Sequence, residues 1–154
     1  MTERQSALIS EARSHVGKVR WRHQGRSWVH GVDCGGFPLL SARDLGWEIE
    51  DFPPGYGRYP DGKRFREHLR KVCVEIPRAE LQPADLILLL DLIPGIWPCH
   101  LAIVANCKER LTIIHSSALE MRVVENGIDA NWEAKMAGYF RFKPIAEEVG
   151  PWRS

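Results

Sequence analysis

The periodicity of the apolar residues changes once along the chain, near Pro83, and this change limits the folds that the chain can adopt. Before Pro83 the apolar residues recur at helical spacing, and after it they form runs of β-type residues separated by turns. The expected strands are Asp85 to Leu90, Cys99 to Asn106, Leu111 to Ser116, Met121 to Glu125 and Tyr139 to Lys143, with a short helix from Ile128 to Met136. Helices followed by strands predict an α+β domain, with N-terminal helices packed on a central antiparallel sheet of about five strands.

Three helices are predicted before the strands. The first ends at Gly17, the second follows Cys34 and ends at Gly46, and the third begins near Lys63. Residues 47–62, between the last two helices, hold four aromatic rings among Pro and Gly. This composition favours a surface loop that is packed down by its own rings.

Length and composition indicate one domain without a membrane or nucleic-acid partner. The 154 residues, 44% of them hydrophobic, are expected to form a domain over residues 1–146 with a tail at 147–154. Lys plus Arg total 21 against 20 for Asp plus Glu, so the net charge of +1 gives no electrostatic reason to bind nucleic acid. The N-terminus lacks the apolar core of a signal peptide, and the longest apolar run, Leu86 to Leu90, is too short to cross a bilayer. We therefore expect synthesis in the cytoplasm and four free cysteines.

The stretch from Gly31 to Phe37 leads from a polar loop into the second helix and contains a candidate nucleophile, Cys34. At a helix N-terminus, unpaired amide groups and the helix dipole favour an anion, which for a cysteine is the thiolate. An isolated cysteine is more often a small buried hydrophobe than a nucleophile. The catalytic interpretation therefore requires a base.

The chain has six histidines, namely His15, His23, His30, His68, His100 and His115. His15 and His68 lie on predicted helices among polar neighbours and are expected to be solvated. His23 and His30 lie in loops near Cys34. The last two, His100 and His115, each occupy an otherwise apolar strand. If residues 107–110 form a hairpin loop, residue 106 opposes 111 and both histidines lie on one face as diagonal neighbours.

A cysteine peptidase needs a thiolate, an imidazole that acts as base, and a polar group that orients the imidazole. Cys34, His100 and His115 can fill these roles in that order. A single histidine in an apolar strand is more often a satisfied core residue, but two on adjacent strands with a helix-start cysteine make catalysis about equally plausible. Metal binding is disfavoured, because Cys99 and His100 point to opposite faces of a strand and no Cys-x-x-Cys pair is present. No metal or other cofactor is expected.

Four segments resemble the motifs of the NlpC-type cell-wall cysteine peptidases, a papain-like superfamily. Asp33-Cys34-Gly35-Gly36-Phe37 resembles their Asp-Cys-x-Gly-hydrophobic motif, and Pro83-Ala84-Asp85-Leu86-Ile87 resembles the Pro-Gly-Asp-Leu start of a strand. His100-Leu-Ala-Ile-Val is similar to their His-Val-Gly-Ile strand, and Ile114-His115-Ser116 to the strand with the third catalytic group. Order and spacing agree over nearly the whole chain, so the resemblance implies a papain-like NlpC-type domain.

The resemblance implies that Cys34 is the nucleophile, His100 the base and His115 the orienting residue, with the Cys34 amide as one oxyanion donor. It also implies that four residues contact the oxyanion or the substrate, namely Trp21, His23, Asp33 and Gly35. Trp21 stands where the family usually has tyrosine, and Gly35 where it usually has Ser or Leu.

The segment Trp21-Arg22-His23-Gln24-Gly25 and the compact length resemble the phage-tail and gene-transfer-agent subgroup. This resemblance implies a peptidase that cleaves the D-γ-glutamyl–diamino acid bond of peptidoglycan stem peptides during DNA delivery. Its partners would be the stem peptide and tail or tail-tip proteins, and it would act in the periplasm or cell wall from a virion or tail particle. Two alternatives stay open: a structural tail-tip component with a vestigial site, and a papain-like amidase or acyltransferase.

Overall fold

The computed structural model describes residues 1–53, 62–93 and 97–150. Residues 54–61 of the expected loop, residues 94–96 and residues 151–154 of the expected tail lie outside the described residues. The helices are α1 (Glu3–Ser14), α2 (Gly36–Asp44), α3 (Gly62–Val72), α4 (Ala130–Glu133) and α5 (Lys143–Val149), with a 3₁₀ turn η1 (Arg78–Glu80). The strands are β1 (Arg26–Ser27), β2 (Gly31–Val32), β3 (Cys73–Ile76), β4 (Leu86–Ile93), β5 (Trp97–Cys107), β6 (Arg110–Ser117), β7 (Arg122–Gly127) and β8 (Met136–Phe142).

Six strands form one antiparallel sheet in the order β3-β8-β4-β5-β6-β7, and β1 pairs with β2 in a separate ribbon. The predicted α+β architecture is confirmed. The sheet has one strand more than expected, because Cys73–Ile76 follows helix α3 without a turn residue and was not predicted as a strand. Its partner is β8, far along the chain, so the pairing has no local signal in the sequence.

The C-terminal part differs from the prediction in two places. The helix expected over residues 128–136 is a single turn, α4, whose first turn is capped by the Asp129 side chain accepting from the Trp132 amide at 3.0 Å. The last strand ends at Phe142, and helix α5 follows with Pro144 in its first turn, where a missing amide is tolerated. The expected boundary between domain and tail, at residue 146, therefore lies inside a helix.

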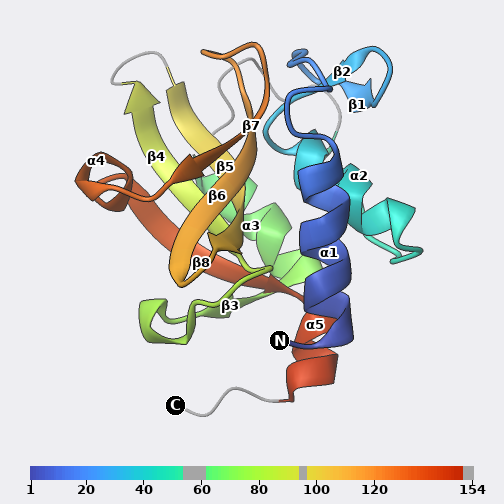
Figure 1. The fold of residues 1–154 in the computed structure, drawn as a ribbon, viewed down its shortest axis with the longest axis vertical. Helices are drawn as coiled ribbons and strands as arrows, with labels where there is room; N and C mark the ends of the chain where they lie inside the picture. The colour runs from blue at the N-terminus through green and yellow to red at the C-terminus, as the bar shows by residue number, and fades with distance from the viewer. Residues whose placement is uncertain (54–61, 94–96, 151–154) are drawn as a thin grey trace.

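The sheet buries apolar side chains on both faces. Helices α1 and α2 lie beside each other on one side of it, whereas α4 lies at the opposite edge of the molecule (Figure 1). The main core contains the inward residues of β4 and β5, namely Leu86, Leu88, Leu101 and Ile103, together with residues of the helices. The alternate residues form a second cluster, Ile87, Leu89, Ala102, Val104 and Ile113, against which Trp132 packs. Among the described residues, no helix has the length and apolar character needed to span a membrane.

The start of β4 is fixed by a buried ion pair. Both oxygens of Asp85 accept from the Arg141 guanidinium, at 2.7 and 2.9 Å, and one also accepts from the Gln82 amide. The preceding residue, Ala84, has a φ of +77°, in the left-handed region that favours glycine. This explains why the NlpC-type motif has glycine at that place, and why alanine costs about 1 kcal/mol here.

Candidate active site

Asp33 organises the turn that leads into α2 and thereby places Cys34. The Gly36 amide donates to Asp33 Oδ1 at 2.7 Å, and the Phe37 amide donates to the Asp33 carbonyl at 3.1 Å. The carboxylate also accepts from Arg26 Nη1 at 2.8 Å and from the Gln24 amide at 3.1 Å. The buried carboxylate thus holds this turn together, and its expected contact with substrate stays a prediction.

The surroundings of Cys34 favour the neutral thiol over the thiolate that the helix start predicts. The residue is only 6% exposed. Burial raises the pKa of the thiol, the negative charge of Asp33 raises it further, and a backbone hydrogen bond with Leu101 and the charge of Arg26 only partly oppose them. The thiol therefore has to lose its proton to a base during any reaction.

The two strand histidines meet as the sequence predicts. Asn106 opposes Leu111 in the β5–β6 pairing, although Cys107 also pairs with Arg110, so that the hairpin loop has only two residues. His100 Nε2 lies 2.7 Å from His115 Nδ1, and the two rings are nearly perpendicular, with centroids 4.8 Å apart. Both side chains are buried, at 1% and 2% exposed.

Asn126 completes this hydrogen-bonded row, and the sequence analysis missed it. Its Oδ1 lies 2.6 Å from His115 Nε2 and can only accept, so His115 carries its proton on Nε2. Nδ1 of His115 is then an acceptor, and His100 donates to it from Nε2. Asn126 opposes Ile113 in the β6–β7 pairing. The strand was predicted to end at Glu125, one residue earlier, so the sequence did not reveal this position.

With its proton on Nε2, His100 has an unprotonated Nδ1 nitrogen, as a general base requires. This nitrogen is buried and has no hydrogen-bond partner among the residues that the structure describes. Burial lowers the pKa of His100 well below its ordinary value, and the neighbouring His115 lowers it further. Burial also lowers the pKa of His115, against the hydrogen bond with Asn126. Both imidazoles are therefore neutral near pH 7, and His100 can accept a proton.

The Cys34 thiol lies against β5 on the face of Cys99 and Leu101, whereas His100 shares the opposite face of this strand with Ala102. Cys34 contacts the backbone of Leu101, the residue after His100, through a hydrogen bond. Leu101 faces the main core with the helices, whereas the next residue, Ala102, faces the second cluster. Within the described part of the chain, no hydrogen bond joins the Cys34 sulfur to His100 Nδ1.

The remaining expected site residues lie around this pair in different environments. The Trp21 amide donates to the Met121 carbonyl at 3.0 Å, and its indole nitrogen is buried. His23 is exposed. A Cβ atom on Gly35 would lie 2.8 Å from the ring of Phe52, so this ring occupies the space of the larger residue that the family usually has.

The sequence predicted a solvated His68, but this residue is buried, at 4% exposed. It packs against Phe52, with ring centroids 4.4 Å apart, and its Nε2 lies 3.1 Å from the Glu50 carbonyl. This contact and the stacking of Phe52 on Phe65 hold down the described part of the aromatic segment at 47–53. Since these neighbours come from different elements, the polar residues around His68 in the sequence did not reveal its burial.

Within the described ranges, one group of side chains has the residue types of a metal site. Ligand atoms of Glu11, His15 and Asp44 lie within 4.8 Å of one another. They are already engaged: His15 Nε2 lies 2.8 Å from Glu11, and the Trp28 indole donates to Asp44 at 2.7 Å while stacking on His15. This group ties α1 to α2 and shares no residue with the row that includes His100.

No family model matches the sequence, and no curated protein does. Solved structures do match the fold. An NlpC/P60 family protein from Bacillus cereus is 23% identical with a TM-score of 0.64 over 90% of this chain and 40% of its own. The peptidoglycan hydrolase RipB from Mycobacterium tuberculosis is 19% identical with a TM-score of 0.57 over 89% of this chain and 63% of its own.

An N-acetylmuramoyl-L-alanine amidase from Bacteroides uniformis is 11% identical, with a TM-score of 0.62 over 92% of this chain and all of its own. The chain thus spans about two fifths of the B. cereus protein and about three fifths of RipB. The expected fold is confirmed: the chain has the α+β fold of NlpC/P60 proteins.

The neutral histidines predict that stability falls in mild acid. The unfolded chain binds a proton at each histidine near pH 6.5, whereas folded His100 and His115 do not, because their pKa values are lowered. The unfolded state then holds more protons, so the free energy of unfolding decreases below that pH by up to about 1.4 kcal/mol per pH unit for each histidine. Urea titrations between pH 7.5 and 5.5 measure this slope. His100→Gln should reduce the slope and the exposed His23→Gln should not; an equal slope in all three proteins would contradict the assignment.

The Asn126 contact predicts the tautomers of both imidazoles. Long-range ¹H–¹⁵N spectra at pH 7.5 should show His100 and His115 protonated on Nε2. Asn126→Ala should give a mixture of His115 tautomers and lower the free energy of unfolding by about 1–3 kcal/mol, because a buried donor loses its partner. Asn106→Ala, which removes an exposed amide at the far end of β5, is the matched control. A proton on Nδ1 of His115 in the unmodified protein would refute the proposed order of donors.

Proposed function

We propose that the protein is a cysteine hydrolase that cleaves amide bonds in peptidoglycan stem peptides, with Cys34 as nucleophile, His100 as base and His115 as orienting residue. The observation that carries the proposal is the bare Nδ1 of His100, set by its bond to His115, on the strand whose backbone contacts the helix-start cysteine. The NlpC/P60 fold supports it, since RipB is a peptidoglycan hydrolase of similar fold.

The neutral pair supports a mechanism in which the proton moves during attack. His100 Nδ1 takes the thiol proton as the Cys34 sulfur bonds to the substrate carbonyl carbon, and the Cys34 amide donates to the resulting oxyanion. The proton then passes to the leaving amine, the C–N bond breaks, and water hydrolyses the thioester with His100 again as base. His115 and Asn126 stabilise the transient imidazolium by accepting along the row.

This step requires the sulfur and Nδ1, which face opposite sides of β5 in this structure, to come within hydrogen-bonding distance. Catalytic hydrogen bonds are often long without substrate and shorten in the complex. The neutral state of both partners fits a resting enzyme whose thiol is activated only when substrate displaces water from the site. A substrate whose peptide carbonyl lies against Cys34 would displace this water.

We further propose that the cleaved bond is the D-γ-glutamyl–diamino acid bond, on the motifs around Cys34, His100 and His115. The amidase with the same fold supplies the second candidate, the bond between the muramoyl group and L-alanine. The two reactions release different new amino termini, a diamino acid in the first case and L-alanine in the second. Mass analysis of the products distinguishes them.

The hydrolase proposal predicts that purified protein releases new amines from purified peptidoglycan. Cys34→Ala should lower the rate by about 1000-fold or more with an unchanged circular dichroism spectrum, because no other group replaces the nucleophile. Cys107→Ala, at an exposed free cysteine, is the matched control and should stay active. If the unmodified protein releases no amine from any bacterial type of peptidoglycan, the hydrolase proposal fails and a vestigial site becomes the better interpretation.

We also propose that the protein acts from a phage tail or gene-transfer-agent particle, with tail proteins as partners. The proposal rests on the resemblance of Trp21-Arg22-His23-Gln24-Gly25 to that subgroup and on the compact length. It predicts that mass spectrometry of purified particles from the source strain detects the chain at a fixed ratio to tail proteins. Detection only in the particle-free cell extract would contradict it.

A further inference from the structure

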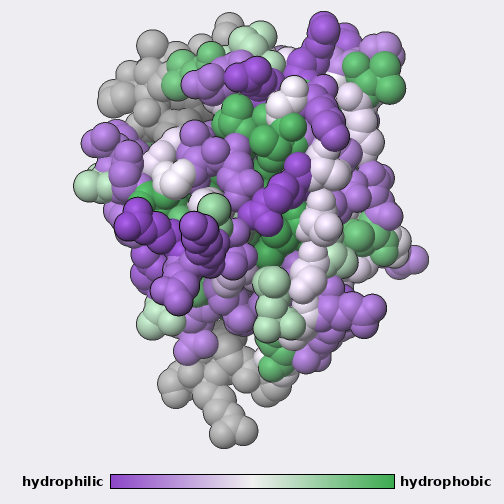
Figure 2. Space-filling view, in the orientation of Figure 1, coloured by the Kyte–Doolittle hydropathy of each residue, from purple (hydrophilic) through white to green (hydrophobic). Residues whose placement is uncertain are grey.

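Helix α4 carries a tryptophan that lies against the hydrogen-bonded row of the candidate site. The Trp132 ring meets the His115 ring edge to face, with centroids 5.3 Å apart and an interplanar angle of 77°. Trp132 is half-buried, whereas its neighbours Asn131 and Glu133 are exposed. The surface around α4 is largely hydrophilic in the space-filling view (Figure 2), so this single turn directs its aromatic ring toward the sheet.

Two contacts fix α4 in this position. At its start, the Asp129 side chain accepts from the Trp132 amide. At its end, Glu133 pairs with Arg78 at 2.8 Å, and the Arg78 guanidinium lies 5.6 Å from the centroid of the Tyr139 ring on β8. These contacts limit where the ring of Trp132 can lie.

The ring lies on the face of the sheet that the two histidines share with the second apolar cluster. Trp132 packs against this cluster, which includes Ile113, two residues before His115. His100 and His115 are almost fully buried, so little water reaches their hydrogen bonds. A hydrogen bond shielded from water is stronger, and the apolar ring over His115 contributes to that shielding.

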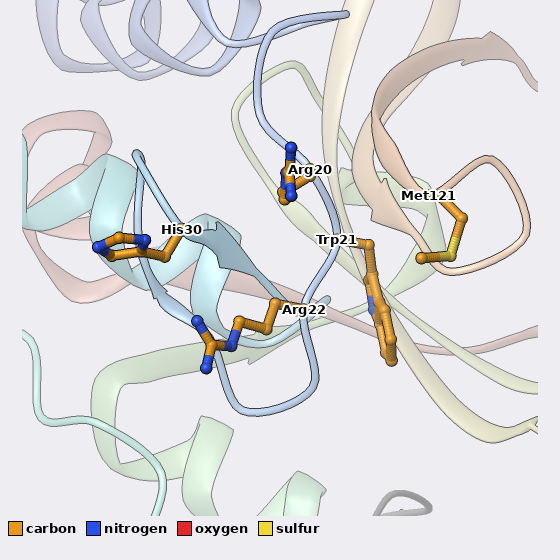
Figure 3. A pocket seen from close by; sticks show the side chains of 5 residues that line it. All are labelled: Arg20, Trp21, Arg22, His30 and Met121. Atoms are coloured by element: carbon orange, nitrogen blue, oxygen red, sulfur yellow. The ribbon is translucent and has the colours of Figure 1, made fainter.

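Trp21 has a different environment. Figure 3 shows the surface pocket that is lined by Arg20, Trp21, Arg22, His30 and Met121. None of these five residues belongs to the row formed by His100, His115 and Asn126. The ring contact with the row therefore comes from Trp132 and not from the tryptophan before the cysteine.

We propose that Trp132 is a positioning residue, which holds the His115 ring in place and keeps water away from the row, so that Nδ1 of His100 stays free to accept a proton. This inference rests on the proposed function. If His115 turned or bonded to water, its Nδ1 would no longer accept from His100, and His100 could carry its proton on Nδ1 instead. A protonated Nδ1 cannot take the thiol proton.

The surroundings of His115 give the expected direction of a pH effect. The groups that face it are His100 on β5, Asn126 on β7 and Trp132 on α4, together with the charge of Glu120. Burial is the largest cause of the lowered pKa of His115, and the hydrogen bond with Asn126 and the charge of Glu120 oppose it. Removing the indole exposes the ring, so the pKa should rise toward its ordinary value.

The test compares Trp132→Ala with Trp132→Phe on a synthetic stem peptide. Trp132→Ala should lower kcat about 10- to 100-fold with little change in KM, because a misplaced base costs up to about 100-fold. The acid limb of its kcat/KM profile should move to higher pH, since the row is protonated earlier as the pH falls. Trp132→Phe, which restores an aromatic ring, should recover most of the rate and the original acid limb. Trp132→Gln replaces the alanine variant if circular dichroism shows that Trp132→Ala does not fold.

Trp47→Ala is the matched control. Trp47 is also half-buried and also meets another ring edge to face, that of Phe142, with centroids 5.9 Å apart. Its loss should leave the acid limb unchanged. An unchanged acid limb in Trp132→Ala, or an equal shift in Trp132→Phe and Trp47→Ala, would overturn the proposal.

The histidine tautomers test Trp132 separately from the proposed function. If the unmodified protein cleaves no stem peptide, the proposed function fails, and long-range ¹H–¹⁵N spectra decide on Trp132 alone. Trp132→Ala should show a mixture of His115 tautomers and a raised His115 pKa, and Trp132→Phe should match the unmodified protein. A single Nε2 tautomer with an unchanged pKa in Trp132→Ala would show that the ring only fills space.

Discussion

The pairing of β5 with β6 is the constraint on which the candidate site depends. Ile103 opposes Ile114, and this register puts His100 and His115 on one face with two ring nitrogens 2.7 Å apart. A slip of one residue would turn one histidine to the other face and into the main core, at the cost of a buried polar group without a partner. The apolar neighbours of each histidine therefore fix the register as well as the environment that keeps both rings neutral.

Two opposing influences act on the pKa of the Cys34 thiol. The helix dipole favours a thiolate by about 0.3–1 kcal/mol, less than one unit of pKa. Burial can raise a pKa by several units, and here the adjacent Asp33 carboxylate acts in the same direction. Asp33 is needed to hold the helix start, so the interaction that positions the sulfur also keeps it protonated. A neutral base with a bare nitrogen is the form of His100 that fits such a thiol.

The sequence predicted those parts of the site that depend on local patterns. Cys34 at a helix start and the register of His100 with His115 followed from helical spacing and from a short hairpin. Asn126 and the burial of His68 depend on contacts between different segments, so no local period reports them. Strand β3 was missed for the same reason, since its pairing with β8 gives it its strand character.

Val32 shows how the segment before the candidate nucleophile is fixed in place. Its carbonyl has two lone pairs and accepts from the Arg22 amide and from Ser116 Oγ, while its amide donates to Arg20. Because each polar group of this buried peptide is used, β2 cannot move toward either neighbour without breaking a bond to the other. The segment from Arg20 to Arg22 and strand β6 thus hold the residue from which the chain turns into Asp33 and Cys34.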